Sequence, residues 1–184
     1  MLTIHLSLEA RAKDVFVFSV ITDLYRKDVF RAYADEEIFV YQGLNKEQLL
    51  ESVNNIRTNS QNLSYHLFVL NSGFEEFTMD QIEEILSSLI KKGLLKVKDN
   101  SYFPIGEGLL FAGNFLIIEN IVEIIIGQLK EDNLYQSNFL MLQAGPLDII
   151  YLEKSEDNII MQCMSSIKAT EFLSTVLGEK PNIV

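Results

Sequence analysis

The chain has 184 residues, of which 48% are hydrophobic, and this content is ample for a real core. Its 26 acidic and 15 basic residues leave a net charge of −11, which disfavours phosphate backbones and anionic membranes as partners. The single cysteine, Cys163, excludes an internal disulfide and suits a reducing cytoplasm. The N-terminus lacks the pattern of an export signal, and Glu119, Asn120 and Glu123 interrupt the most apolar run, so we expect a cytoplasmic chain without a membrane span.

The first part of the chain predicts a strand and then a buried helix. Residues 3–8 alternate polar and apolar side chains, which is typical of a short strand. Residues 9–25 are apolar around most of the helical circumference, so this helix should be buried on more than one side. A second strand is expected over residues 37–41, and Gly43 ends it.

A capped helix is predicted next, with Asn45 as its N-cap and Gln48 closing a capping box. Its hydrophobic staple and buried stripe comprise Leu44, Leu49, Leu50, Val53 and Ile56. The polar residues 57–64 predict a loop, and residues 65–70 predict a strand.

The segment from residue 77 to residue 104 has the outline of a winged helix, in which a helix is followed by a two-stranded hairpin. A capping box and a hydrophobic staple define the helix start, and their residues are Thr78, Gln81, Phe77 and Ile82. Gly93 is placed to adopt the left-handed C-terminal cap. Residues 95–98 and 101–103 then predict two strands joined by the turn Asp99-Asn100.

The remainder predicts antiparallel strands and one last helix. Gly106, Gly108 and Gly113 loosen the segment after the hairpin, which should hold a short helix over residues 109–112. Strands are expected over residues 121–129, 134–143, 147–153 and 159–164, followed by a helix over residues 167–177. This order predicts an α+β fold: an antiparallel sheet flanked by helices, in one domain over residues 1–184. Its helix-rich half is about 1–92, and its strand-rich half with the C-terminal helix is about 93–184.

The sequence offers few groups for catalysis. His5 and His66 have no partner at helical metal-site spacing, and Cys163 shares a strand face with apolar residues, so structural roles are favoured over ligand or nucleophile roles. Neighbouring acids such as Glu83-Glu84 fit a solvated face. The glycines at 106, 108 and 113 match neither a dinucleotide fingerprint nor a phosphate loop. We expect no catalytic residues, no cofactor and no metal.

A DNA-binding winged helix would insert the helix that precedes its hairpin into the major groove. Here that helix carries Asp80, Glu83 and Glu84, which oppose phosphate contacts, and the hairpin supplies only Lys96 and Lys98. Nucleic acid is therefore disfavoured as a partner, and a transcriptional regulator is kept as the alternative function.

The half of the chain from Leu86 onward resembles the EspG family of type VII secretion chaperones. The resemblance rests on the run Leu89-Ile90-Lys91-Lys92-Gly93-Leu94, the run Asp99-Asn100-Ser101-Tyr102-Phe103-Pro104, the strand from Ile121, and Ala144-Gly145 before the final hairpin. It ends with a hairpin that leads into a helix, Met161 to Leu177. It implies a cytoplasmic adaptor that holds a helical secretion substrate and keeps it soluble.

The residues by themselves also favour a non-catalytic, protein-binding module. We hypothesise that Leu109, Leu110 and Phe111, between glycines, present an apolar surface to an amphipathic helix of a partner. The alternative for these three residues is ordinary core packing. Sequence alone leaves the oligomeric state open.

Overall fold

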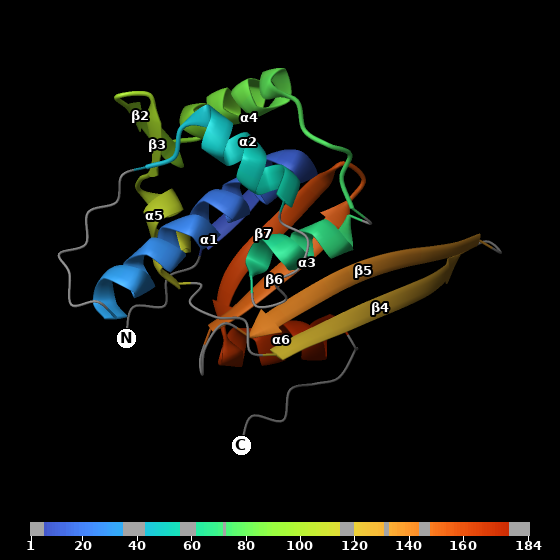
Figure 1. Cartoon of the computed structure of the whole chain (residues 1–184). Coiled ribbons are helices and arrows are strands. Elements are labelled where there is room, and N and C mark those ends of the chain that lie inside the picture. Colours follow the sequence, from blue (N-terminus) through green and yellow to red (C-terminus); the bar gives the residue numbers. More distant parts are fainter. Residues whose placement is uncertain are drawn as a thin grey trace. The chain divides into compact units, whose positions relative to one another are not determined.

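The computed structural model describes residues 6–34, 43–55, 62–71, 73–114, 120–130, 133–143 and 148–176. Within them the fold is α+β, as predicted, with antiparallel sheets of five and two strands and six helices (Figure 1). Contacts divide the chain into a helical unit, Ala10–Ile117, and a sheet unit, Met1–Glu9 with Ile118–Val184. The single domain over residues 1–184, with halves of about 1–92 and 93–184, stays a prediction. The hairpin after α4 lies in the helical unit.

The helical unit is organised around α1 (Ala12–Ala34). This helix contacts α2 (Lys46–Asn55), α3 (Leu63–Leu70), α4 (Met79–Lys91) and α5 (Glu107–Asn114). Its first half is buried on all sides, which confirms the expectation from its apolar circumference, and the apolar residues concerned are Val15, Phe16, Val17, Phe18, Val20 and Ile21.

The predicted bounds of the first two elements were wrong. Strand β1 spans Leu6–Arg11, so α1 begins at Ala12 instead of residue 9 and continues beyond Tyr25 to Ala34. Pairing of β1 with another strand of the sheet decides this boundary, because it holds residues that local propensity assigns to the helix. Residues 3–5 and the strand predicted over residues 37–41 lie outside the described residues.

Helix α2 confirms its predicted capping box. The Gln48 backbone N–H donates to Asn45 Oδ1 at 2.8 Å, and the Asn45 N–H donates to Gln48 Oε1 at 3.1 Å. Leu49 and Val53 of its stripe are buried, and Ile56 lies outside the described residues.

The strand predicted over residues 65–70 was wrong, because these residues belong to α3. A short apolar run fits a buried strand and a buried helix equally well, so periodicity could not decide between them. In the folded chain Leu63, His66 and Leu67 share the three- and four-residue spacing of one helix face, and all three are buried.

The segment from α4 to the hairpin follows its prediction closely. Thr78 caps α4, Gln81 completes the capping box, and Gly93 adopts a φ of 73° after the helix. Strands β2 (Leu95–Lys98) and β3 (Ser101–Pro104) pair antiparallel, and Asp99 and Asn100 both have positive φ in the turn between them. An isolated bridge from Leu44 to Tyr102 adds a further strand position beside β3.

The sheet unit is an antiparallel meander with strand order β1-β7-β6-β5-β4 (Figure 1). Its consecutive strands are β4 (Asn120–Lys130), β5 (Asn133–Gln143), β6 (Asp148–Ser155) and β7 (Asn158–Ser165), close to the predicted bounds. Helix α6 (Ser166–Val176) packs on one face through Ala169, Phe172 and Leu173, against Phe139, Met141, Tyr151 and Met164. The buried residues of the other face are Leu140, Leu142, Ile150, Leu152, Ile159, Met161 and Cys163.

Candidate functional site

The exposed face of α4 is the candidate site that the winged-helix outline singles out. Asp80, Glu83 and Glu84 are all exposed, whereas Ile82, Ile85, Leu86 and Leu89 are buried on the other side of the helix. Each acid therefore lies where a DNA-reading helix would approach phosphates.

Two of these acids are held by basic side chains from other elements of the helical unit. Arg11 Nη1 lies 2.5 Å from Glu84 Oε1, and Lys46 Nζ lies 2.6 Å from Glu83 Oε1. These hydrogen bonds raise the pKa of Arg11 and of Lys46, since each donor favours its charged form beside a carboxylate. Arg11 and Lys46 are thus engaged by acids of α4.

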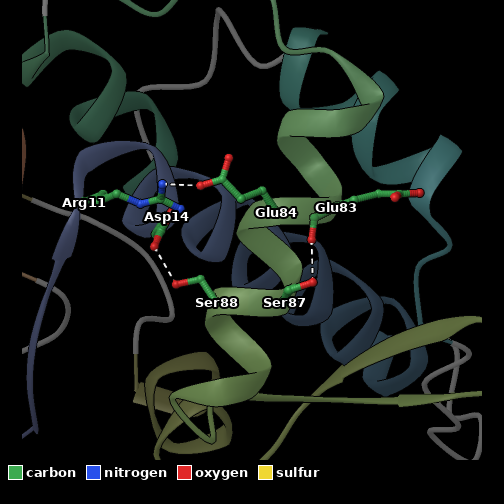
Figure 2. A network of polar contacts seen from close by, with 6 residues as sticks. All are labelled: Arg11, Asp14, Glu83, Glu84, Ser87 and Ser88. Atoms are coloured by element: carbon green, nitrogen blue, oxygen red, sulfur yellow. Dashed lines mark hydrogen bonds and ion pairs between the residues drawn. The ribbon is translucent and has the colours of Figure 1, made fainter.

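Figure 2 shows how Arg11 joins the start of α1 to α4. Its Nη2 lies 2.9 Å from Asp14 Oδ1, and Ser88 Oγ donates to Asp14 Oδ2 at 2.8 Å. Asp14 is buried, and each of its two carboxylate oxygens accepts a hydrogen bond, as a buried polar group requires. This network fixes the orientation of α4 through polar contacts in addition to its apolar stripe.

The start of α4 is fixed from α2. Asn54 Nδ2 donates to the Phe77 carbonyl at 3.1 Å, and the Phe77 N–H donates to Asn54 Oδ1 at 2.9 Å. Phe77 itself is buried and stacks on Phe16 with a centroid distance of 5.8 Å. The side chain of Asn54 thus satisfies both backbone polar groups of Phe77, the residue that precedes the Thr78 cap.

A buried polar cluster joins α1 to α3, and the sequence reading missed it. Asp23 Oδ2 accepts from Ser64 N at 3.0 Å and from Ser64 Oγ at 2.5 Å, while Asp23 Oδ1 pairs with Arg26. Burial raises the pKa of Asp23, and Arg26 and Ser64 oppose this shift; burial also lowers the pKa of Arg26. Asp23 thus caps α3 from another helix, because Asn62 at the N-cap position makes no side-chain cap.

One nitrogen of Arg26 differs from the other donors of this cluster. Nη1 of Arg26 has no hydrogen-bond partner among the described residues, although the side chain is buried. The only signal for the pair in the sequence is the spacing of three residues between Asp23 and Arg26 in a helical segment.

The residues considered for catalysis lie in different parts of the chain. His66 is buried in α3 of the helical unit, Cys163 is buried in β7 of the sheet unit, and His5 lies outside the described residues. Among the described residues, no group of three or more His, Cys, Asp or Glu side chains is arranged to hold a metal ion.

The predicted apolar surface falls on α5. Leu109 is 44% exposed, and the side chains of Leu110 and Phe111 lie outside the part that the structure describes. Gly108 has a packing role that the sequence reading missed: a Cβ there would lie 2.1 Å from the Leu94 carbonyl oxygen. This glycine therefore allows α5 to approach the backbone after α4 closely.

The sheet unit has a shallow depression of about 420 Å³ between β7, α6 and Ser7 of β1. Gln162, Met164, Lys168, Glu171 and Phe172 line it together with Cys163. Alternation along β7 places Cys163 on the face that Ile159 and Met161 share, whereas Gln162 and Met164 lie on the other face. The lining combines polar groups of Ser7, Gln162, Lys168 and Glu171 with apolar groups of Met164 and Phe172.

Comparisons with protein-family models, with curated proteins and with solved structures find no match to this chain. No helix in the described ranges combines the length and the apolar character needed to cross a bilayer.

Proposed function

We propose that this chain is a non-catalytic protein-binding adaptor or chaperone that acts in the cytoplasm. The observation that carries the proposal is the exposed face of α4, where Glu83 and Glu84 are paired with Lys46 and Arg11. A helix that presents acids, and whose neighbouring basic side chains are already engaged, favours a protein surface over a phosphate backbone.

The client in this proposal is an amphipathic helical segment. Leu109 offers exposed apolar area on α5, and the net charge of −11 favours a client whose polar face is basic. The resemblance of the second half of the chain to EspG-like chaperones suggests a substrate of a type VII-like secretion system as that client.

Co-purification from the native host with a tagged chain tests this proposal. A client recovered in this way should become more soluble when it is co-expressed with the chain. Leu109→Ser should weaken the complex, whereas the matched variant Ile167→Ser, at a 72% exposed position on α6, should leave it intact. Recovery of no protein partner, or a client whose solubility does not respond, would reject the adaptor function.

A winged-helix transcriptional regulator is the second candidate, and one observation favours it. The bridge from Leu44 to Tyr102 gives the β2–β3 hairpin the third strand position that a wing commonly has, and Lys96 and Lys98 are exposed on β2. This function predicts duplex DNA binding at low salt that weakens in a Lys96→Glu, Lys98→Glu variant. Fluorescence anisotropy with a labelled duplex decides, and an unchanged signal at low salt excludes the regulator.

A further inference from the structure

The open edge of β4 is the feature of the sheet unit that the proposed function does not use. β4 is last in the strand order, and it pairs with β5 over its whole length, from Asn120↔Gln143 to Lys130↔Asn133. No described strand pairs with its other edge. In an antiparallel pair every second residue directs its N–H and C=O away from the partner, so a row of backbone groups lies along this edge.

The far half of this hairpin has less support than the rest of the sheet. β5 pairs with β6 only from Phe139 to Gln143, so Asn133–Asn138 have β4 as their strand partner among the described residues. Figure 1 shows the β4–β5 hairpin extending past β6. A ribbon of two strands is only marginally stable in water, so a further strand beside β4 would stabilise it.

The residues of β4 resemble those of a central strand instead of an edge strand. Residues 121–129 contain no proline and no lysine, and apolar residues occupy both sets of alternate positions along the strand: Val122, Ile124 and Ile126 in one set, and Ile121, Ile125 and Leu129 in the other. Ile121 and Val122 are 47% and 53% exposed. Natural edge strands usually carry charges, prolines or bulges that prevent pairing, and β4 has one charge in this stretch, Glu123.

We propose that β4 pairs antiparallel with β4 of a second copy of this chain, about a twofold axis at Ile125. This pairing joins the two five-stranded sheets into one continuous sheet. It goes beyond the proposed adaptor function, and each can hold without the other.

Self-complementarity of the strand identifies the second copy as the occupant. About Ile125, Ile124 lies opposite Ile126, Ile121 lies opposite Leu129, and Glu123 lies opposite Gly127. Lys130 lies opposite Asn120, so within residues 120–130 no like charges meet in this register, and β4 carries one acid and one base.

Cysteine cross-linking of the full chain tests the pairing and its register. In a Cys163→Ala background, Ile125→Cys places two thiols on the twofold axis, with Cα atoms within the roughly 4.4–6.8 Å that a disulfide requires. The matched variant Gln128→Cys lies opposite Val122 of the other copy, so its two thiols are about 20 Å apart. Under mild oxidation Ile125→Cys should form a covalent dimer, and Gln128→Cys should stay monomeric.

A charge exchange supplies an independent measurement that does not depend on oxidation. Ile125→Lys and Ile125→Glu should each be monomeric in light scattering, because like charges then lie opposite each other. Mixing the two variants should restore a dimer. This result would also show that both variants are folded, because unfolded chains could not pair in this way. Self-pairing is refuted if the wild-type chain is monomeric, if Ile125→Cys does not cross-link, or if both cysteine variants cross-link equally. It is also refuted if the chain is a monomer whose β4 edge binds an extended segment of another protein.

Discussion

The Asp23 cluster gives the sharpest test of the helical unit. In Asp23→Ala, Ser64 N, Ser64 Oγ and Arg26 lose their acceptor, and Arg26 becomes a buried charge without a counterion. Removing one partner of a buried pair costs about 3–5 kcal/mol. We therefore expect Asp23→Ala to lower the free energy of unfolding by about this amount.

Two matched variants separate the charge from the cap. Ser64→Ala removes only a hydroxyl and keeps the backbone N–H bond to Asp23, so its cost should be about 1 kcal/mol. Arg26→Met should cost less than Asp23→Ala, because burial already raises the pKa of Asp23, and a carboxyl can take up a proton whereas a guanidinium stays charged. The loss of unfolding free energy should therefore be largest for Asp23→Ala, which leaves the Arg26 charge buried without a counterion.

Urea unfolding of the full chain, followed by circular dichroism at neutral pH, measures these differences. The slope with denaturant should remain that of the wild type, so that changes in midpoint report stability. If Asp23→Ala costs no more than Ser64→Ala, the ion pair contributes nothing and the reasoning about the buried charge is wrong.

Three further outcomes are expected from the same unfolding assay. Thr78→Ala should cost about 1 kcal/mol, because it removes the side-chain acceptor of the α4 capping box, and a cost near zero would contradict the role of this cap. Gly108→Ala should lower the free energy of unfolding by about 1–3 kcal/mol, because its Cβ would clash with the Leu94 backbone. If stability does not change, α5 can move away from Leu94. Gly93→Ala is the control, because a Cβ there meets open space and only the left-handed backbone conformation is strained. The pKa of Asp23 is raised above 3.8, so above this pH the folded chain keeps a proton that the unfolded chain releases. The stability of the wild type relative to Asp23→Asn should therefore fall as pH rises above about 3.8, by at most about 1.4 kcal/mol per pH unit. A rise of this relative stability with pH would contradict the direction of the pKa shift.

Local chemistry in the sequence was sufficient to predict the helix–hairpin segment. The cap of α4 depends on Thr78 and Gln81, three residues apart, and the turn of the hairpin depends on Asp99 and Asn100. The strands of the meander could be predicted for the same reason, since alternation and turn residues are local signals. The α+β class follows from the order of these elements.

Interactions between distant residues decided what the sequence left open. Residues 65–70 belong to α3, whose first turn is capped by Asp23, 41 residues before Ser64, and no short-range pattern contains that contact. Arg11 and Glu84 likewise pair across 73 residues, so the sequence near α4 does not show that this acid has a basic partner. The unpaired edge of β4 follows from strand order: its apolar residues predict a strand, and only the tertiary structure shows that no described strand pairs with its other edge. Local propensity is encoded within a few residues, whereas burial, ion pairing and strand order depend on which segments the folded chain brings together.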